Sequence, residues 1–96
     1  MSVYLIAKIS IKDRENYARY EEGFMDIWSR YQGKLLVVDE QPEVLEGDWD
    51  CTRTVLLEFP GEAEAKAWYH SDEYQALAEH RFASSDGNIV LVKGFD

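Results

Sequence analysis

Apolar residues are distributed along the chain in short runs with the two-residue period, or the continuous apolar character, of β-strands. Pro42 follows the second run, and Pro60 with Gly61 follows the third, where proline and glycine interrupt a strand. The first run is apolar at alternate positions, whereas the two central runs are apolar on both faces. The pattern predicts four strands, over residues 3–11, 34–40, 52–59 and 89–94.

Between the predicted strands, apolar and aromatic residues recur every three or four positions, which is the period of a helix that buries one face. Asp13 is expected to cap a first helix, and Gly33 to end it in the left-handed conformation that glycine favours. A second helix is predicted over residues 62–69. Ser71 begins a third helix that runs to about Phe82.

Three connecting segments have no helical or strand period. Residues 43–47 can form a strand extension or an arm, and residues 48–50 are expected to form a surface loop. Trp49 lies in this acidic loop, so it is expected to be exposed and to reach across a dimer or cover a pocket mouth. Residues 84–88, Ser-Ser-Asp-Gly-Asn, are typical of a turn and predict a loop before the last strand.

The predicted order is that of an α+β protein with the ferredoxin-like βαββαβ arrangement, whose four-stranded antiparallel sheet carries its helices on one face. One sheet face would contain Leu5, Leu35, Val37, Val55, Leu57, Ile89 and Leu91. The other would contain Tyr4, Ile6, Leu36, Val38, Leu56, Val90 and Val92. Since soluble monomers rarely expose so much apolar surface, we expect two sheets to pack face to face in a homodimer that covers ~800 Å² per subunit.

The composition fits one compact domain that spans residues 1–96, because 46% of the chain is hydrophobic and 14% is aromatic. The formal charge of -9 would repel phosphate backbones and anionic lipid, so nucleic-acid and membrane-surface partners are not expected. No signal segment or membrane span is recognised in the sequence, and a cytoplasmic location is expected. The single cysteine, Cys51, has no obvious neighbouring base and is interpreted as a bystander thiol.

Two residues are candidates for proton transfer. Glu58 interrupts an apolar strand, and a partly buried carboxylate there could serve as a proton acceptor. The alternative is that Glu58 pairs with Arg53 or Arg81, or reaches solvent. His80 is the second candidate base, with a surface position as its alternative. The two histidines lack metal-ligand spacing, so neither a metal nor a cofactor is expected.

The candidate ligand-binding residues are aromatic residues with polar tips and two arginines. Paired N–H donors on an arginine can hold an anionic ligand, although arginine near acids also forms structural ion pairs. The rings could line a pocket for a flat aromatic ligand, and their helical spacing equally suits the core. The candidates are Tyr20, Arg53, Trp68, Tyr74 and Arg81.

Several motifs make the chain similar to a known family. The most specific is Glu58-Phe59-Pro60, followed by Trp68-Tyr69-x-Ser71-x-x-Tyr74-Gln75. Together with Tyr31-Gln32-Gly33-Lys34, Leu45-Glu46-Gly47-Asp48-Trp49 and the closing Leu91-Val92-Lys93-Gly94, it resembles the family called domain of unknown function 1330, almost end to end. Asp72 departs from the proline expected at that position of the family pattern. The resemblance implies the dimeric α/β-barrel superfamily, and no established activity.

These observations favour a homodimer that binds a small apolar or aromatic ligand, anionic or neutral, in a pocket between helices and sheet. One alternative is a cofactor-independent monooxygenase or isomerase acting on an aromatic or enolisable compound. Glu58 or His80 would then accept a proton, and an arginine would stabilise the oxyanion. A second alternative is a structural dimer with no small-molecule function.

Overall fold

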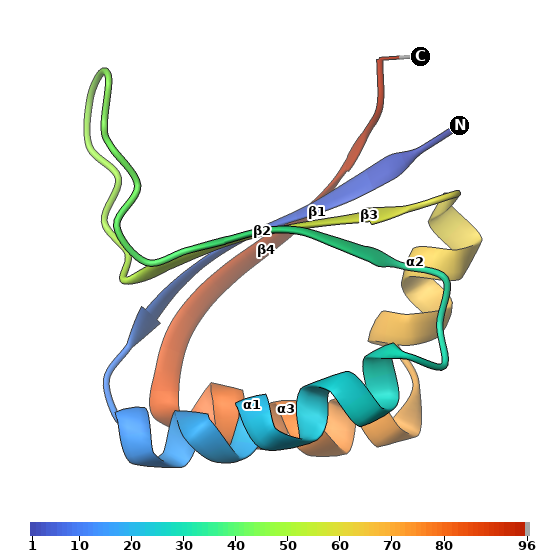
Figure 1. Cartoon of the computed structure of the whole chain (residues 1–96), viewed down its shortest axis with the longest axis horizontal. Helices are drawn as coiled ribbons and strands as arrows, with labels where there is room; N and C mark the ends of the chain where they lie inside the picture. Colours follow the sequence, from blue (N-terminus) through green and yellow to red (C-terminus); the bar gives the residue numbers. More distant parts are fainter. Residues whose placement is uncertain (96) are drawn as a thin grey trace.

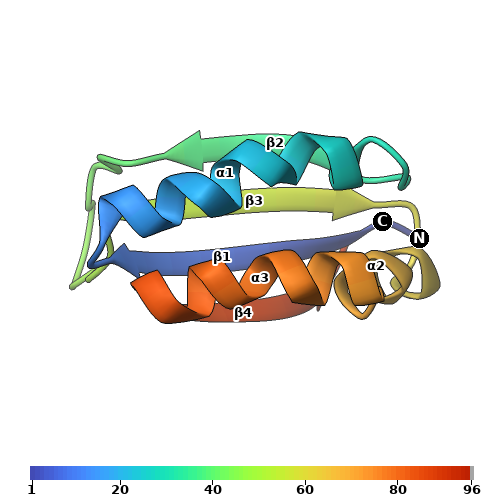
Figure 2. The ribbon, with the colours of Figure 1, turned by 90° about the horizontal axis from the view of Figure 1, so that it is seen from below.

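The computed structural model describes residues 1–95 and has the ferredoxin-like topology that the sequence predicts. The elements are β1 (Val3–Ile11), α1 (Arg14–Trp28), β2 (Lys34–Asp39), β3 (Arg53–Phe59), α2 (Glu62–Tyr69), α3 (Asp72–Ser84) and β4 (Ser85–Lys93). The sheet is antiparallel in the order β2-β3-β1-β4. All the helices lie on one face of it (Figure 1), with α1 across β2 and β3 and α3 across β1 and β4 (Figure 2).

The register of the strands arranges the side chains of the helix-covered face in rows across the sheet. The first row is Leu35, Leu57, Leu5 and Leu91. The second row is Val38, Val55, Ala7 and Ile89. The third row is Arg53, Ile9 and Gly87. The inner face therefore changes along the strands from wholly apolar to a row that carries a cation.

A register shift in β2 corrects the predicted faces of this strand. Leu35 pairs with Leu57, but Val37 pairs with Leu56 and Val38 with Val55, so the strand contains a bulge between Leu35 and Val37. A bulge adds one residue to one strand, and every side chain after it changes face. Val38 therefore joins the inner face and Val37 the outer one, the reverse of the sequence expectation.

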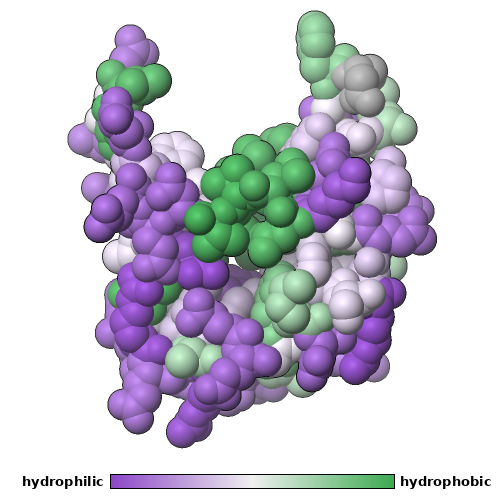
Figure 3. Space-filling model, in the orientation of Figure 1, coloured by the Kyte–Doolittle hydropathy of each residue, from purple (hydrophilic) through white to green (hydrophobic). Residues whose placement is uncertain are grey.

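The outer face of the sheet is apolar and uncovered in the single chain. One row crosses all four strands and consists of Val37, Leu56, Ile6 and Val90. Within this row, Val37 is 39% exposed and Val90 is 53% exposed. In the orientation of Figure 3, apolar side chains gather over the edge strand β2, whose four central residues are all exposed.

Two corrections concern the ends of the helices. Helix α1 ends at Trp28, and Gly33 is not left-handed; among the described residues only Gly47 has a positive φ, of 77°. The segment 84–88 is not a loop, because β4 begins at Ser85 directly after α3 and pairs with β1 from Ile11 onward. Pairing along the whole of β1 outweighs the turn preference of these residues.

The helix starts are those that the sequence predicts. The Asp13 carboxylate accepts a hydrogen bond from the Asn16 N–H at 3.2 Å, and the Ser71 hydroxyl accepts one from the Tyr74 N–H at 3.1 Å. Ser71 also donates to the Trp68 carbonyl at 2.8 Å, so a single side chain connects the end of α2 to the start of α3. This connection fixes the relative position of Trp68 and Tyr74.

We expect Ser71→Ala to lower the free energy of unfolding by about 1 kcal/mol, the usual cost of losing a helix N-cap. Chemical denaturation followed by circular dichroism measures this loss. Ser71→Asp, which also caps helices, is expected to recover most of the stability. A Ser71→Ala variant as stable as the unmodified chain would show that the hydroxyl does not hold the two helices together.

The segment between β2 and β3, residues 40–52, is called the arm here and projects from the sheet on the side opposite the helices (Figure 1). Leu45 on the arm is 86% exposed. Trp49 is 41% exposed, as the sequence predicts, and its indole N–H donates to the Thr54 hydroxyl at 2.9 Å. The Lys8 ammonium lies 4.4 Å from the centre of the Trp49 ring.

Candidate functional site

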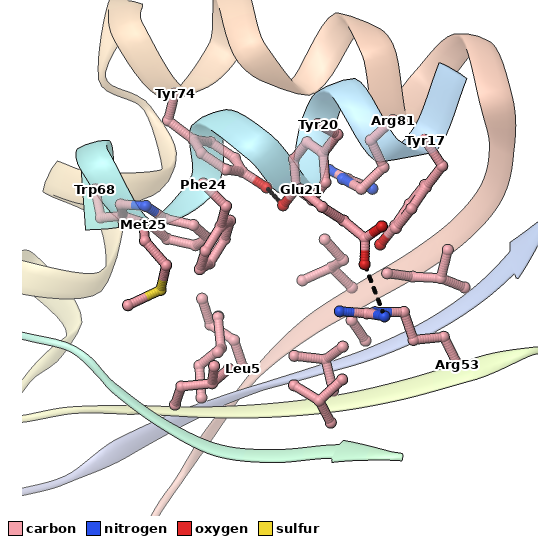
Figure 4. Close-up of a pocket in the computed structure, with 17 residues that line it drawn as sticks. Leu5, Tyr17, Tyr20, Glu21, Phe24, Met25, Arg53, Trp68, Tyr74 and Arg81 are labelled. Atoms are coloured by element: carbon pink, nitrogen blue, oxygen red, sulfur yellow. Dashed lines mark hydrogen bonds and ion pairs between the residues drawn. The ribbon is translucent and has the colours of Figure 1, made fainter. Parts of the chain in front are cut away.

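A cavity of about 270 Å³ lies between the inner face of the sheet and the helices. Figure 4 shows its walls, with helix side chains on one side and the strands on the other. Strand residues from the inner-face rows form the floor: Leu5, Ala7, Ile9, Leu35, Val38, Arg53, Val55, Leu57 and Ile89. The helices contribute Tyr17, Tyr20, Glu21, Phe24, Met25, Trp68, Tyr74 and Arg81.

Two phenols meet in the cavity wall. The hydroxyl groups of Tyr20 and Tyr74 form a hydrogen bond of 2.7 Å, although α1 and α3 carry these residues 54 positions apart. Burial raises the pKa of Tyr74, and burial, with the neighbouring Tyr74, raises the pKa of Tyr20 well above its usual value. Both phenols therefore keep their protons at neutral pH and can act as hydrogen-bond donors.

Arg81 places a positive charge in the same wall. Its side chain extends from α3, only 3% of the residue is exposed, and its guanidinium carbon lies 5.8 Å from the centre of the Tyr20 ring. Burial works against this charge, but the neighbouring Tyr74 and Tyr20 raise the pKa of Arg81 overall. No carboxylate within the described chain forms an ion pair with this guanidinium.

Arg53 differs from Arg81 because its charge is already balanced. Its Nη1 atom lies 2.7 Å from a carboxylate oxygen of Glu40 and 3.2 Å from one of Glu21. Arg14 also binds Glu40, at 2.9 Å. The hydrogen bond from Arg53, with the contribution of Arg14, holds the pKa of Glu40 below its usual value. These ion pairs connect α1 to the sheet at one end of the cavity.

The opposite end of the cavity is aromatic. Figure 4 shows Trp68 and Met25 at the end away from Arg53, with Tyr20 and Tyr74 between the two ends. The Trp68 ring lies 4.2 Å from that of Tyr74 and 5.0 Å from that of Trp28, measured between ring centres. These contacts hold the indole rigidly, so the cavity offers one polar, cationic end and one flat apolar end.

In the described chain, the buried side-chain polar atoms that lack a hydrogen-bond partner all belong to residues that line this cavity. Among residues 1–95, the buried side-chain nitrogen and oxygen atoms without a hydrogen-bond partner are Arg53 Nε, Trp68 Nε1, Arg81 Nε and Arg81 Nη2. All four atoms are N–H donors, and all three residues line the cavity. Since a buried donor without an acceptor costs roughly 1–3 kcal/mol, the site is suited to a ligand that supplies acceptor atoms.

The structure brings together all five residues predicted to bind a ligand, Tyr20, Arg53, Trp68, Tyr74 and Arg81.

The structure does not place the two candidate bases, Glu58 and His80, with these five residues. Glu58 lies on the outer face of the sheet, paired with Tyr4, whose hydroxyl donates to it at 3.1 Å. The suggested pairing of Glu58 with Arg53 or Arg81 does not occur. His80 Nδ1 lies 3.3 Å from the side-chain oxygen of Asn16. Neither residue lines the cavity, and their catalytic role stays a prediction.

Sequence reasoning did not select Glu21 and Met25 as site residues. Both lie on the face of α1 that contains Tyr17 and Phe24, at intervals of three or four residues, so helical spacing could have placed them at the cavity. No pattern in the sequence indicates that Val38 lies on the inner face, because this position results from the bulge in β2.

The solved structures that resemble this chain share its fold. A protein of unknown function from Rhodopseudomonas palustris has a TM-score of 0.81 at 18% identity, over 99% of this chain and 83% of that one. A cofactor-independent oxygenase from Streptomyces nogalater, SnoaB, has a TM-score of 0.69 at 9% identity, over 99% and 94%. A dimeric ferredoxin-like protein of unknown function from Thermobifida fusca has a TM-score of 0.67 at 12% identity, over 98% and 92%.

The fold is therefore that of the ferredoxin-like, dimeric α/β-barrel proteins. The model of the domain of unknown function family DUF1330 matches residues 2–95, so the chain belongs to this family, as its motifs indicate. The search of curated proteins gives no match.

In the described part of the chain, no helix is long and apolar enough to cross a membrane. Within residues 1–95, no three His, Cys, Asp or Glu side chains gather where they could hold a metal ion. The cytoplasmic location stays a prediction.

Proposed function

We propose that this protein binds a small, mostly apolar or aromatic molecule with an anionic group in the cavity between its helices and sheet. The observation that supports this function is the set of four buried N–H donors without acceptors, two of them on Arg81. A guanidinium in a site with few water contacts attracts an anion far more strongly than it does in bulk water. The flat wall at Trp68 suits the apolar body of the same ligand.

The size of the cavity limits the ligand. Pockets for drug-sized molecules have volumes of roughly 300–1,000 Å³, and this cavity has about 270 Å³. A molecule of one or two rings with a short polar substituent fits such a volume. The polar group would lie near Ile9 and Gly87, whose row lies at the charged end, and the rings near Leu5 and Leu57.

Filling the cavity tests this function. We expect Val55→Phe to remove ligand binding, because Val55 lies on the cavity floor and the larger ring would occupy the ligand's space. Native mass spectrometry of the purified protein detects a co-purified molecule, and thermal-shift screening with small aromatic acids detects added ones. Val44→Phe makes the same substitution on the exposed arm and should leave binding unchanged. Equal binding by both variants would contradict this location.

The second candidate function is a cofactor-independent monooxygenase or isomerase. Arg81 favours it because an unpaired guanidinium would stabilise the oxyanion left when an enolisable or phenolic substrate loses a proton. SnoaB, with the same fold, is a cofactor-independent oxygenase. The sequence predicts Glu58 or His80 as the proton acceptor for this reaction, but neither residue lines the cavity, so Glu58→Gln and His80→Gln should each be assayed. Turnover that survives both changes would exclude these two residues as the base.

We also propose that the working form is a homodimer in which two outer sheet faces pack against each other. The apolar row Val37, Leu56, Ile6 and Val90 supports this arrangement, because an uncovered apolar sheet is uncommon in soluble monomers. The arm rises beside this face and could contact a second copy (Figure 1).

A further inference from the structure

We propose that the ligand is a monocarboxylate that enters the cavity already ionised, with its carboxylate at Arg81 and its apolar body beside Trp68. This inference rests on the proposed function and specifies the chemical class of its ligand. Three properties of the cavity support it: the number of uncompensated charges, the lack of a free base, and the arrangement of the donors.

The cavity contains one uncompensated positive charge. Arg53 is neutralised by Glu21 and Glu40, whereas Arg81 has no carboxylate partner among the described residues. A ligand with a single negative charge would therefore neutralise the site. A dianion such as a phosphate monoester would bring a second charge into an apolar cavity, where an unpaired charge is costly.

The cavity also lacks a group that could take a proton from a weakly acidic ligand. Glu21 is the only carboxylate among the described lining residues, and it is bound to Arg53. Glu58 lies on the outer face, and His80 lies outside the cavity. A phenol, with a pKa near 10, would arrive neutral at pH 7 and stay neutral, whereas a carboxylic acid, with a pKa near 4, is already ionised.

The donors match two acceptor oxygens better than one. The Nε and Nη2 atoms of Arg81 lie on the same edge of the planar guanidinium, where their N–H bonds can serve both oxygens of a carboxylate. Nη1 lies on the strand side, 3.3 Å from the position of a Cβ added to Gly87. The Tyr20 and Tyr74 hydroxyls share one of their two protons, which leaves the other for the ligand.

Isothermal titration calorimetry with three compounds of one ring system tests this inference. We expect 2-naphthoate to bind at least about tenfold more tightly than 2-naphthamide or 2-naphthol, because it alone carries a full charge at pH 7. Arg81→Met should weaken 2-naphthoate binding roughly 10- to 100-fold and change 2-naphthamide binding by less than about twofold. Arg81→Lys, which keeps the charge and loses the planar fork, should give an intermediate loss.

The pH profile provides a second measurement. Between pH 6 and 9 the naphthoate stays ionised, and the buried Tyr20 and Tyr74 stay protonated because their pKa values are raised, so its affinity should be constant. Binding of 2-naphthol that strengthens with pH and exceeds that of the acid would overturn the carboxylate assignment and leave the proposed function standing. Equal affinity for acid and amide would also overturn it. If no compound of the series and no co-purified molecule binds, the proposed function itself fails.

Discussion

Gly33→Ala is expected to lower the free energy of unfolding by about 3 kcal/mol, the upper part of the usual range for an overpacked core. A Cβ at this position would lie 2.3 Å from Cη2 of Trp28 and 2.8 Å from Cζ of Phe59. Both rings are buried and in contact, with centres 5.3 Å apart, so neither can move without disturbing the other. Thermal unfolding should show a midpoint roughly 10 to 20 °C lower.

The same substitution at Gly47 provides the control. Gly47 lies on the arm with a φ of 77°, and a Cβ there would meet no atom within 4 Å. Gly47→Ala should therefore cost only the backbone strain, about 1 kcal/mol. In a Trp28→Phe background the clash at Gly33 loses its nearest atoms, so Gly33→Ala should cost less there than in the unmodified chain. Equal costs in both backgrounds would show that the Trp28 ring is not the obstacle.

Gly33 also shows where sequence reasoning reaches its limit. Glycine after a helical segment is typical of a left-handed cap, and this local rule predicted the wrong role. The true requirement is space for a ring from the end of α1, which only the folded chain reveals. The loop predicted for residues 84–88 was wrong for a similar reason. Their composition is typical of a turn, but β1 is long enough to pair with them as part of β4.

The sequence predicted best those features that depend on neighbouring residues, such as helix N-caps, or on a regular spacing of apolar residues. Strand β1 has its predicted bounds, and Asp13 and Ser71 cap helices because their side chains reach the first free N–H groups. Helical spacing likewise placed Tyr20 and Tyr74 in the interior, and the structure adds their contact.

The different states of the two arginines could not be predicted from the sequence. Arg53 and Arg81 are equivalent in any sequence argument, because acidic residues are abundant throughout the chain. In the fold, Arg53 lies within reach of α1 and the arm, where Glu21 and Glu40 bind it. Arg81 extends from the last turn of α3 into the wall that contains Tyr20 and Tyr74, and no carboxylate of the described residues pairs with its charge. Tertiary placement therefore decides which of these two arginines is held in an ion pair and which keeps its charge unpaired.

Val90→Asp is expected to convert a dimer into a monomer. The unmodified protein should have twice the chain mass of 11.2 kDa in light scattering, and the variant should have the mass of one chain. Val90 belongs to the apolar row on the outer face and is 53% exposed in the single chain, so a carboxylate there is tolerated by the monomer. In a symmetric dimer both subunits would carry the new carboxylate in the interface. Each buried, unpaired carboxylate would reduce the free energy of association by several kcal/mol.

Val37→Asp, at the other end of the row, should have the same effect, because its neighbour Leu56 links it to the same apolar surface. Ala76→Asp introduces the same charge on the exposed side of α3 and should leave the dimer intact. Circular dichroism of each variant separates dissociation from unfolding, since a folded monomer keeps its helices and sheet. A wild-type particle of 11.2 kDa at micromolar concentration, or a Val90→Asp variant that stays dimeric, would contradict the packing of two sheets through this face.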